Sequence, residues 1–235
     1  MRDLEARLQE VRHRVARAAE RAGRSPSEVR IVAVSKTVPP EIVAEAYRLG
    51  QRDFGENRVQ ELREKRPAVE LLGATEGIRW HLIGHLQSNK AKLAVRLSDI
   101  IHSVDSVRLA RQLDAHAGAL GRRLPVLLEV DFTGLPQRGG FAPVELEARV
   151  PELLLLPNLE VRGLMTVAPL GLDRDELRSV FRQLRGLRDR LADRHREADW
   201  RELSMGMSDD YEVAIEEGST IVRIGRAIFG ERPQA

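Results

Sequence analysis

The sequence predicts a single α/β domain, a (β/α)8 barrel of the TIM type over residues 1–235, with an extra amphipathic helix at residues 1–24. Three observations favour this fold. Short apolar runs alternate with amphipathic segments eight times, the composition does not change along the chain, and 235 residues suit one barrel. The alternative is an open doubly wound sheet built from the same strands.

The chain begins with a helix and then a buried strand. Residues 3–22 place leucine, valine and alanine at helical spacing against an Arg/Glu face, and Gly23 provides a stop. The segment VRIVAVSKT at 29–37 then supplies the unbroken Val/Ile/Ala run of a buried parallel strand. Residues 31–34 should therefore lie inside the sheet, with Lys36 emerging at its carboxyl end.

The rest of the chain repeats this pattern. Seven further apolar runs predict strands at residues 53–57, 79–83, 100–104, 124–130, 159–167, 203–204 and 220–224. Amphipathic segments predict helices at residues 41–50, 58–69, 106–119, 143–155, 173–196 and 211–217, one more after the loop HLQSNK, and a short one after Gly225. The strands at 53–57 and 203–204 have the weakest signals.

Composition excludes several classes of protein. The 38 basic and 36 acidic residues interleave along the helical segments, and aromatic residues make up only 4% of the chain, so we expect no nucleic-acid partner. The absence of cysteine excludes disulfides, thiolate metal sites and cysteine nucleophiles. No apolar run approaches a membrane span, and the charged start does not read as a signal peptide. We therefore expect a cytoplasmic monomer with no membrane partner.

Lysine is scarce, which draws attention to one of its positions. Only four of the basic residues are lysines: Lys36, Lys65, Lys90 and Lys92. Lys36 ends an apolar strand, and its ε-amine, unlike a guanidinium, can lose its proton and condense with an aldehyde to form a Schiff base. The alternative is a strand-end lysine that keeps its head group in water.

Two glycine-containing loops predict a phosphate site. They follow the seventh and eighth strands, where barrels often bind phosphate, and read SMGMSDD (204–210) and VRIGRAIFG (222–230). Gly206 and Gly225 let backbone N–H groups approach an anion, and Ser204 and Ser208 add hydroxyls. The alternative is that these residues only form tight turns. GRAIFG lacks the Lys-Ser/Thr of a nucleotide P-loop.

A lysine across the barrel mouth from a phosphate site is the arrangement that pyridoxal 5′-phosphate (PLP) requires. Arg223, on the eighth strand, is then predicted to face the pyridine nitrogen and to keep it unprotonated. The alternative pairs Arg223 with a carboxylate such as Glu129.

The polar residues after the second and third strands complete the predicted pocket. Asn57 and His81 are interpreted as pocket groups or as satisfied turn residues. His81 and His85 straddle a strand-to-loop junction, and no glutamate follows His81 as the zinc-protease motif requires, so we expect no metal.

The sequence strongly resembles the pyridoxal phosphate homeostasis proteins, the YggS/PROSC-like family, whose fold is related to the N-terminal barrel of alanine racemase. The matching stretches run from about Val32 to Gly230: AVSKT, FGENRVQE, WHLIGHLQSNK, HSVDS, RGLMTVAP, SMGMSDDYEVAIEEGST and VRIGRAIFG. The resemblance implies PLP bound as an imine on Lys36, Arg223 towards the ring nitrogen, and phosphate contacts around Ser204, Gly206, Ser208, Gly225 and Arg226. The loop TGLPQRGGF departs from the family pattern, with Arg138 where lysine is common.

The resemblance also implies a function. Members of the family are regarded as PLP carriers or regulators in vitamin B6 homeostasis, with PLP-dependent apoenzymes as partners and no established turnover. The alternative is a PLP-dependent amino-acid racemase or a related fold-type III enzyme. Racemisation needs an acid/base on each face of the cofactor, and the chain ends about five residues after IFG, leaving no room for a second domain. Tyr47 and Tyr211 are interpreted as packing residues, so we expect a carrier without catalytic residues.

Overall fold

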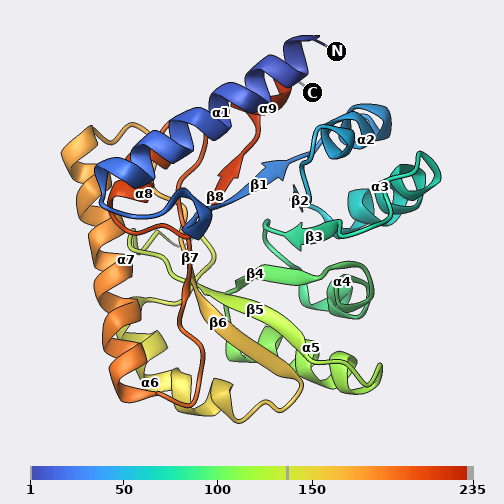
Figure 1. Cartoon of the computed structure of the whole chain (residues 1–235). Helices are drawn as coiled ribbons and strands as arrows, with labels where there is room; N and C mark the ends of the chain where they lie inside the picture. Colours follow the sequence, from blue (N-terminus) through green and yellow to red (C-terminus); the bar gives the residue numbers. More distant parts are fainter. Residues whose placement is uncertain (1, 136–137, 232–235) are drawn as a thin grey trace.

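The computed structural model describes residues 2–135 and 138–231. Eight parallel strands close into a barrel in chain order, with β8 pairing to β1 (Figure 1). The barrel prediction is confirmed and the open-sheet alternative is wrong. The strands are β1 (Arg30–Val34), β2 (Asp53–Glu56), β3 (Arg79–Leu82), β4 (Ile100–Val104), β5 (Leu124–Glu129), β6 (Leu159–Met165), β7 (Glu202–Ser204) and β8 (Ile221–Ile224).

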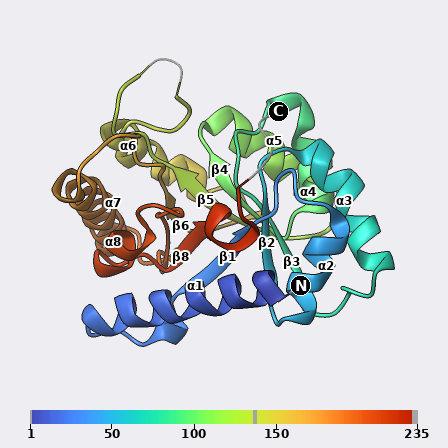
Figure 2. The same cartoon turned by 90° about the horizontal axis from the view of Figure 1, so that it is seen from above.

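Helices surround the barrel, as the view from above shows (Figure 2). Those that follow the strands are α2 (Pro40–Arg48), α3 (Val59–Leu71), α4 (Ala91–Leu97), α5 (Val107–Gly118), α6 (Pro143–Leu154), α7 (Arg174–Arg194), α8 (Tyr211–Glu216) and α9 (Arg226–Phe229). Two short 3₁₀ helices, η1 (Pro26–Glu28) and η2 (Ser88–Lys90), lie in connections. None of the described helices has the length and apolarity needed to cross a membrane.

The two strands with the weakest sequence signals are both present. In β2, Phe54 pairs in register with Trp80 of β3. In β7, only three residues long, Ser204 pairs with Ile221 of β8 and with Met165 of β6. The short strands form because each has a hydrogen-bonded neighbour on both sides in the closed sheet.

The first helix, α1 (Arg2–Arg21), lies across the outside of the barrel against α8 and α9 (Figures 1 and 2). Its apolar stripe is buried there, with Leu8 and Val15 at 1% and 3% exposure. Charged residues border the contact, where Arg14 and Arg21 donate hydrogen bonds to Glu212 of α8. The apolar stripe of α1 therefore covers α8 and α9, the helices on either side of the closing strand β8.

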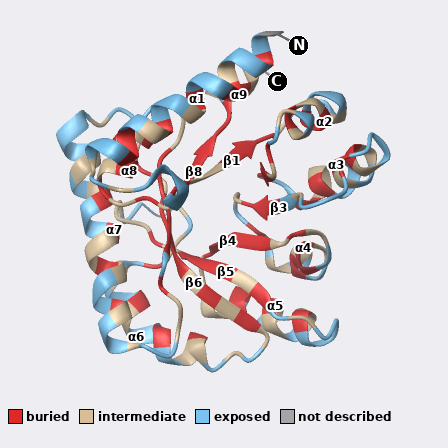
Figure 3. Cartoon of the chain, in the orientation of Figure 1, coloured by how far each residue is buried: buried red, intermediate tan, exposed pale blue. Residues whose placement is uncertain are grey.

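Alternation along the strands separates two cores. Side chains that point outward pack against the helices and are almost wholly apolar, such as Phe54 and Trp80, both 0% exposed. Their chain neighbours Asp53 and His81 are also buried but point to the barrel interior, where they bond to one another. Figure 3 shows the strands mostly buried and the outer faces of the helices exposed.

Candidate functional site

A cavity of about 710 Å³ opens at the carboxyl ends of the strands, the side of a (β/α)8 barrel where active sites occur. Strand ends and the loops after them supply its walls. Its described lining residues are Val34, Lys36, Asn57, Ile83, Gly84, His85, Glu129, Val167, Met207, Ser208, Asp209, Arg223, Gly225, Arg226, Gly230 and Glu231.

Strand alternation places Lys36 in the cavity wall. Val32 is packed in the barrel interior, and Val34 and Lys36, two and four residues further, line the cavity above it. The next residue, Thr37, has φ of 62°, the only positive φ of a non-glycine residue in the part of the chain that the structure describes. Its N–H donates to Glu61 Oε1 at 2.5 Å, which fixes this turn against α3.

A second lysine lies behind this turn. Lys65 of α3 is only 5% exposed and its ammonium donates to Ser35 O at 2.5 Å, Glu56 Oε1 at 2.8 Å and Glu61 Oε1 at 2.7 Å. Ser35 Oγ donates to the same Glu56 oxygen at 2.7 Å. Lys65 therefore supports the loop that carries Lys36. Scarcity alone does not distinguish the two lysines, whereas their positions do.

The loops after β7 and β8 meet on the side of the cavity next to β1, because β8 pairs directly with β1, and not across the barrel mouth from it. Ser208 Oγ accepts hydrogen bonds from the backbone N–H groups of Gly225 at 3.3 Å and Ala227 at 3.4 Å. Arg226 forms an ion pair with Asp209 at the exposed rim. The two segments that the sequence analysis assigned to a phosphate site thus form one polar corner, with backbone donors, a hydroxyl and a cation.

Arg223 lies at the floor of the cavity. The guanidinium is buried, and donates from Nη1 to Ser204 Oγ at 2.6 Å and from Nη2 to Thr166 O at 2.8 Å. Burial lowers the pKa of Arg223 to about 10, against the opposing influence of Asp210 and Glu129. The side chain still carries its charge at neutral pH. Its hydrogen bonds go to Ser204 and Thr166 and not to Glu129, so the predicted alternative pairing is wrong.

Glu129 lines the cavity at the end of β5. Burial, reinforced by the nearby charge of Asp105 and partly offset by that of Arg223, raises the pKa of Glu129 to about 7. This carboxyl group therefore changes protonation near neutral pH within the cavity.

Three predicted cofactor contacts do not line the cavity. His81 and Ser204 are buried in the layer of inward-pointing side chains directly below the cavity. Each lies at least two residues before the loop residues that form the cavity wall. Gly206 has φ of 94°, and a Cβ there would lie 2.6 Å from Ala214 Cβ of α8, so this glycine serves the turn and the packing of α8. The remaining six predicted residues, Lys36, Asn57, Ser208, Arg223, Gly225 and Arg226, all line the cavity.

Sequence reasoning missed several lining residues. It considered Glu129 only as a partner for Arg223, and it gave His85, Met207 and Asp209 no individual role within the loops that it predicted to line the pocket. Alternation was the available signal for Glu129, because Leu127, two positions earlier, packs in the barrel interior. The family departure at Arg138 adjoins the cavity, where its Nη1 donates to Val167 O at 2.8 Å.

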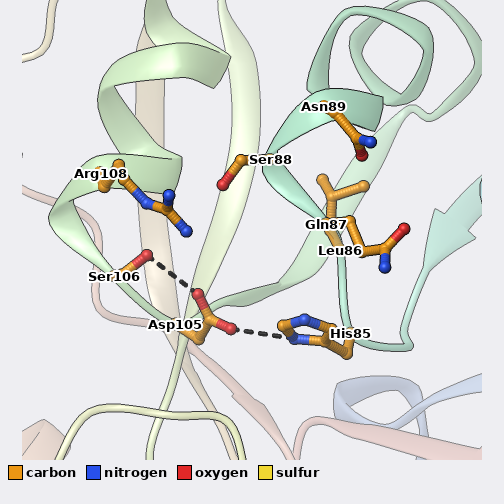
Figure 4. A pocket seen from close by; sticks show the side chains of 8 residues that line it. All are labelled: His85, Leu86, Gln87, Ser88, Asn89, Asp105, Ser106 and Arg108. Carbon is orange, nitrogen blue, oxygen red and sulfur yellow. Dashed lines mark hydrogen bonds and ion pairs between the residues drawn. The ribbon is translucent and has the colours of Figure 1, made fainter.

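A smaller hollow of about 340 Å³ adjoins the cavity through His85 (Figure 4). It lies between the loops after β3 and β4. Asp105 accepts a hydrogen bond in it from Ser106 Oγ at 3.1 Å, and Asp105 Oδ2 lies 3.1 Å from His85 Nδ1. Its lining residues are His85, Leu86, Gln87, Ser88, Asn89, Asp105, Ser106 and Arg108. Within the described residues, no cluster of three or more His, Asp or Glu side chains has the arrangement of a metal site.

The fold and the cavity together define a (β/α)8 barrel that presents a primary amine, a buried guanidinium and a polar corner of backbone donors around one space. Residues 6–233 match the family model of the alanine racemase N-terminal domain. The pyridoxal phosphate homeostasis protein of Aquifex aeolicus (strain VF5) is 44% identical over 226 residues, which cover 96% of this chain and 97% of that one. The chain therefore belongs to the family of pyridoxal phosphate homeostasis proteins.

Solved structures agree with this assignment. PipY of Synechococcus elongatus PCC7942, solved with PLP bound, superposes with a TM-score of 0.85 at 41% identity, over 97% of this chain and 100% of that one. Alanine racemase of Clostridium difficile 630 superposes with a TM-score of 0.73 at 18% identity, over 100% of this chain and 58% of that one. The second likeness concerns the fold alone.

Proposed function

We propose that this protein binds PLP in the cavity, holds it as a Schiff base on Lys36, and acts as a carrier or regulator in intracellular PLP homeostasis. The observation that carries the proposal is the convergence of Lys36, Arg223 and the Ser208–Gly225 corner on one cavity. The names of the relatives and the PLP in PipY support it.

The groups present fit PLP, since its aldehyde, its phosphate and its ring nitrogen each have a suitable partner in the cavity. Bound PLP supplies an aldehyde that condenses with a primary amine and releases water. Lys36 provides that amine, Ser208, Gly225 and Arg226 provide the donors and the cation that a phosphate requires, and Arg223 provides a cation for the ring nitrogen. Asn57 adds a polar group to the wall.

The covalent part of the proposal is tested at Lys36. Reduction of the PLP-loaded protein with borohydride should fix PLP to the peptide that contains Lys36, while Lys36→Ala should fix none there and lose the visible absorbance of bound PLP. Lys92→Ala, which removes an exposed lysine, is the matched control and should behave as wild type. Equal fixation in the Lys36 variant would disprove the assignment.

We further propose that the protein does not turn over amino acids at enzymatic rates. Its close relatives bear the name of homeostasis proteins, and its likeness to a racemase is confined to the barrel. Incubation of the PLP-loaded protein with L- and D-amino acids in deuterated water measures α-proton exchange and racemisation. Sustained multiple turnovers that vanish in Lys36→Ala would establish an enzyme instead.

The proposal extends to the setting in which the protein works. We propose a cytoplasmic monomer, with residues 1–235 acting as one domain, that exchanges PLP with PLP-dependent apoenzymes. Sedimentation equilibrium tests the monomer. Mixing the PLP-loaded protein with an apoenzyme and following recovery of the apoenzyme's activity tests the exchange, which should proceed faster than from free PLP at equal concentration.

A further inference from the structure

A continuous chain of hydrogen bonds crosses the barrel interior below the cavity. Arg223 Nη1 donates to Ser204 Oγ at 2.6 Å, Ser204 Oγ lies 2.9 Å from His102 Nδ1, His102 Nε2 lies 2.8 Å from His81 Nδ1, and His81 Nε2 lies 2.8 Å from Asp53 Oδ1. The side chains come from β8, β7, β4, β3 and β2, and each is less than 10% exposed.

The two ends of the chain are charged and differ in sign. Arg223 lines the cavity. Asp53 begins β2 at the opposite end of the barrel, where Arg79 donates to its second oxygen at 2.8 Å. Burial raises the pKa of Asp53, but the bonds from His81 and Arg79 outweigh this effect and hold the pKa below its usual value. Asp53 at one end therefore only accepts hydrogen bonds, whereas Arg223 at the other end only donates them.

These ends fix the direction of every bond between them. The short N···N contact between the two imidazoles holds a single hydrogen, so one of these nitrogens is bare. Burial keeps both imidazoles neutral by lowering the pKa values of His81 and His102. His81 must then carry its hydrogen on Nε2 to donate to Asp53, which makes its Nδ1 the acceptor from His102.

Ser204 lies between His102 and Arg223 and completes the series of hydrogen bonds. With its hydrogen on Nε2, His102 presents a bare Nδ1 to Ser204, whose hydroxyl donates there while its oxygen accepts from Arg223. In the opposite arrangement, the hydroxyl hydrogen of Ser204 would have no acceptor among its contacts. All four bonds therefore point from Arg223 towards Asp53.

We propose that four buried side chains act as positioning residues: Ser204, His102, His81 and Asp53. Their hydrogen bonds all point in one direction and hold the guanidinium of Arg223 at the cavity floor. They thereby set the contact between Arg223 and the PLP ring. This part rests on the proposed function, since it assigns Arg223 to the ring. These hydrogen bonds also connect the cavity to Asp53 and Arg79 at the opposite end of the barrel.

The direction of the hydrogen bonds between Arg223 and Asp53 is tested without any ligand. Long-range ¹H–¹⁵N NMR of the imidazole rings in the PLP-free protein at neutral pH should show both His81 and His102 as neutral Nε2–H tautomers. An Nδ1–H tautomer or an imidazolium at either residue would overturn the proposal. This result does not depend on whether PLP binds, so it separates the failure of this inference from failure of the proposed function.

The effect on the cavity is tested by comparing two buried serines. Ser204→Ala removes the acceptor of Arg223, whereas Ser219→Ala removes a hydroxyl that bonds only to backbone carbonyl oxygens near β7 and β8. Loss of one hydrogen bond to a charged group corresponds to roughly a tenfold change in affinity. We expect Ser204→Ala to weaken PLP binding about tenfold and to shift the visible absorbance of bound PLP, with Ser219→Ala unchanged in both.

A second test restores the hydroxyl group at position 204. Ser204→Thr keeps the hydroxyl that accepts from Arg223 and donates to His102, so its absorbance should return to that of the wild type even if the added methyl group lowers stability. An unchanged absorbance in Ser204→Ala, or an equal shift in Ser219→Ala, would show that the chain does not act on the cavity. Should Ser204→Ala fail to fold, the tautomers of the wild type still decide the proposal.

Discussion

The outward and inward faces of the same strands carry different chemistry. On the outward face, Phe54 and Trp80 lie with ring centroids 5.7 Å apart in an apolar layer beneath the helices. On the inward face, one residue away in each strand, Asp53 and His81 are bonded at 2.8 Å. Both faces are buried, yet the polar network of the inward face joins five strands, whereas the outward face has a buried polar cluster where Lys65 of α3 meets Glu56.

The comparison shows how the fold separates stability from binding. Apolar burial contributes free energy in proportion to area and is not directional, so the outer layer stabilises the fold without holding a polar group in one orientation. Buried polar groups stabilise only when each finds its partner, and in return they hold a side chain in one orientation. The outer layer should therefore govern unfolding, and the inner layer the behaviour of the cavity.

The largest expected effect is a loss of stability in the outer layer. Phe54→Ala removes a fully buried ring, and such truncations cost about 3–5 kcal/mol in the free energy of unfolding. Urea denaturation measures this loss, and the visible absorbance of PLP bound to the folded variant should be unchanged. A loss below about 1 kcal/mol, or an altered absorbance, would break the separation between the two faces.

The next effect belongs to the inward face and depends on pH. The pKa of Glu129 is raised to about 7 in the folded protein, so the folded state retains the proton longer than the unfolded chain does. The stability that the protonated form contributes is complete below the ordinary pKa of glutamate and is lost as the pH rises through 7. The loss is roughly 3 kcal/mol at most, and is reduced by solvent that reaches the cavity.

Glu129→Gln should abolish this dependence. Unfolding free energies of the PLP-free protein at about pH 5 and about pH 8 should differ more in the wild type than in the variant, with the wild type less stable at the higher pH. Parallel pH profiles for the two proteins would mean that Glu129 does not titrate in this range.

A smaller effect is expected in the polar corner. Gly225→Val places a branched side chain beside the backbone donor that reaches Ser208, and should weaken PLP binding about tenfold, or about 1.4 kcal/mol, without loss of helical circular dichroism. Gly186→Ala, in the middle of α7, is the control, since a Cβ there meets only the end of Arg190 at 3.7 Å. Unchanged PLP affinity in Gly225→Val would exclude this corner as the phosphate site.

The smallest effect is expected at the rim. Arg226 and its partner Asp209 are both exposed, and exposed ion pairs contribute little to stability. Arg226→Gln should leave the unfolding transition in place and weaken PLP binding modestly, with the difference from wild type shrinking as salt is added. A difference that does not respond to salt would mean that Arg226 acts by a route other than its charge.

The sequence was sufficient to predict the outward-facing apolar layer and the positions at which the strands end. Apolar runs located all eight strands, including β2 and β7, because outward residues such as Phe54 and Leu203 keep their hydrophobic character. The abrupt change from Val34 to polar residues marked the position at which Lys36 emerges. The predicted start of α5 at residue 106 agrees with the structure, where Ser106 caps the helix and its Oγ accepts from Leu109 N–H at 3.3 Å.

The depth of an inward residue could not be read from the chain. Alternation determines which face a side chain points to, but the stagger between strands determines its layer, and that depends on the closed barrel. His81 and Ser204 were therefore assigned to the cavity although they lie beneath it. Partners such as His102 and Asp53, which are 21 and 28 residues from His81 in the chain, had no local signal at all.

The three acceptor oxygens around Lys65 have one more consequence. An aldehyde in solution reacts with any accessible amine, whereas guanidinium groups do not form imines. With Lys65 withdrawn into its ion pairs, the lysines outside the cavity that meet solvent are Lys90 and Lys92, against 34 arginines among the 38 basic residues. The surface thus retains its positive charges while offering few side-chain amines for background reaction with an aldehyde.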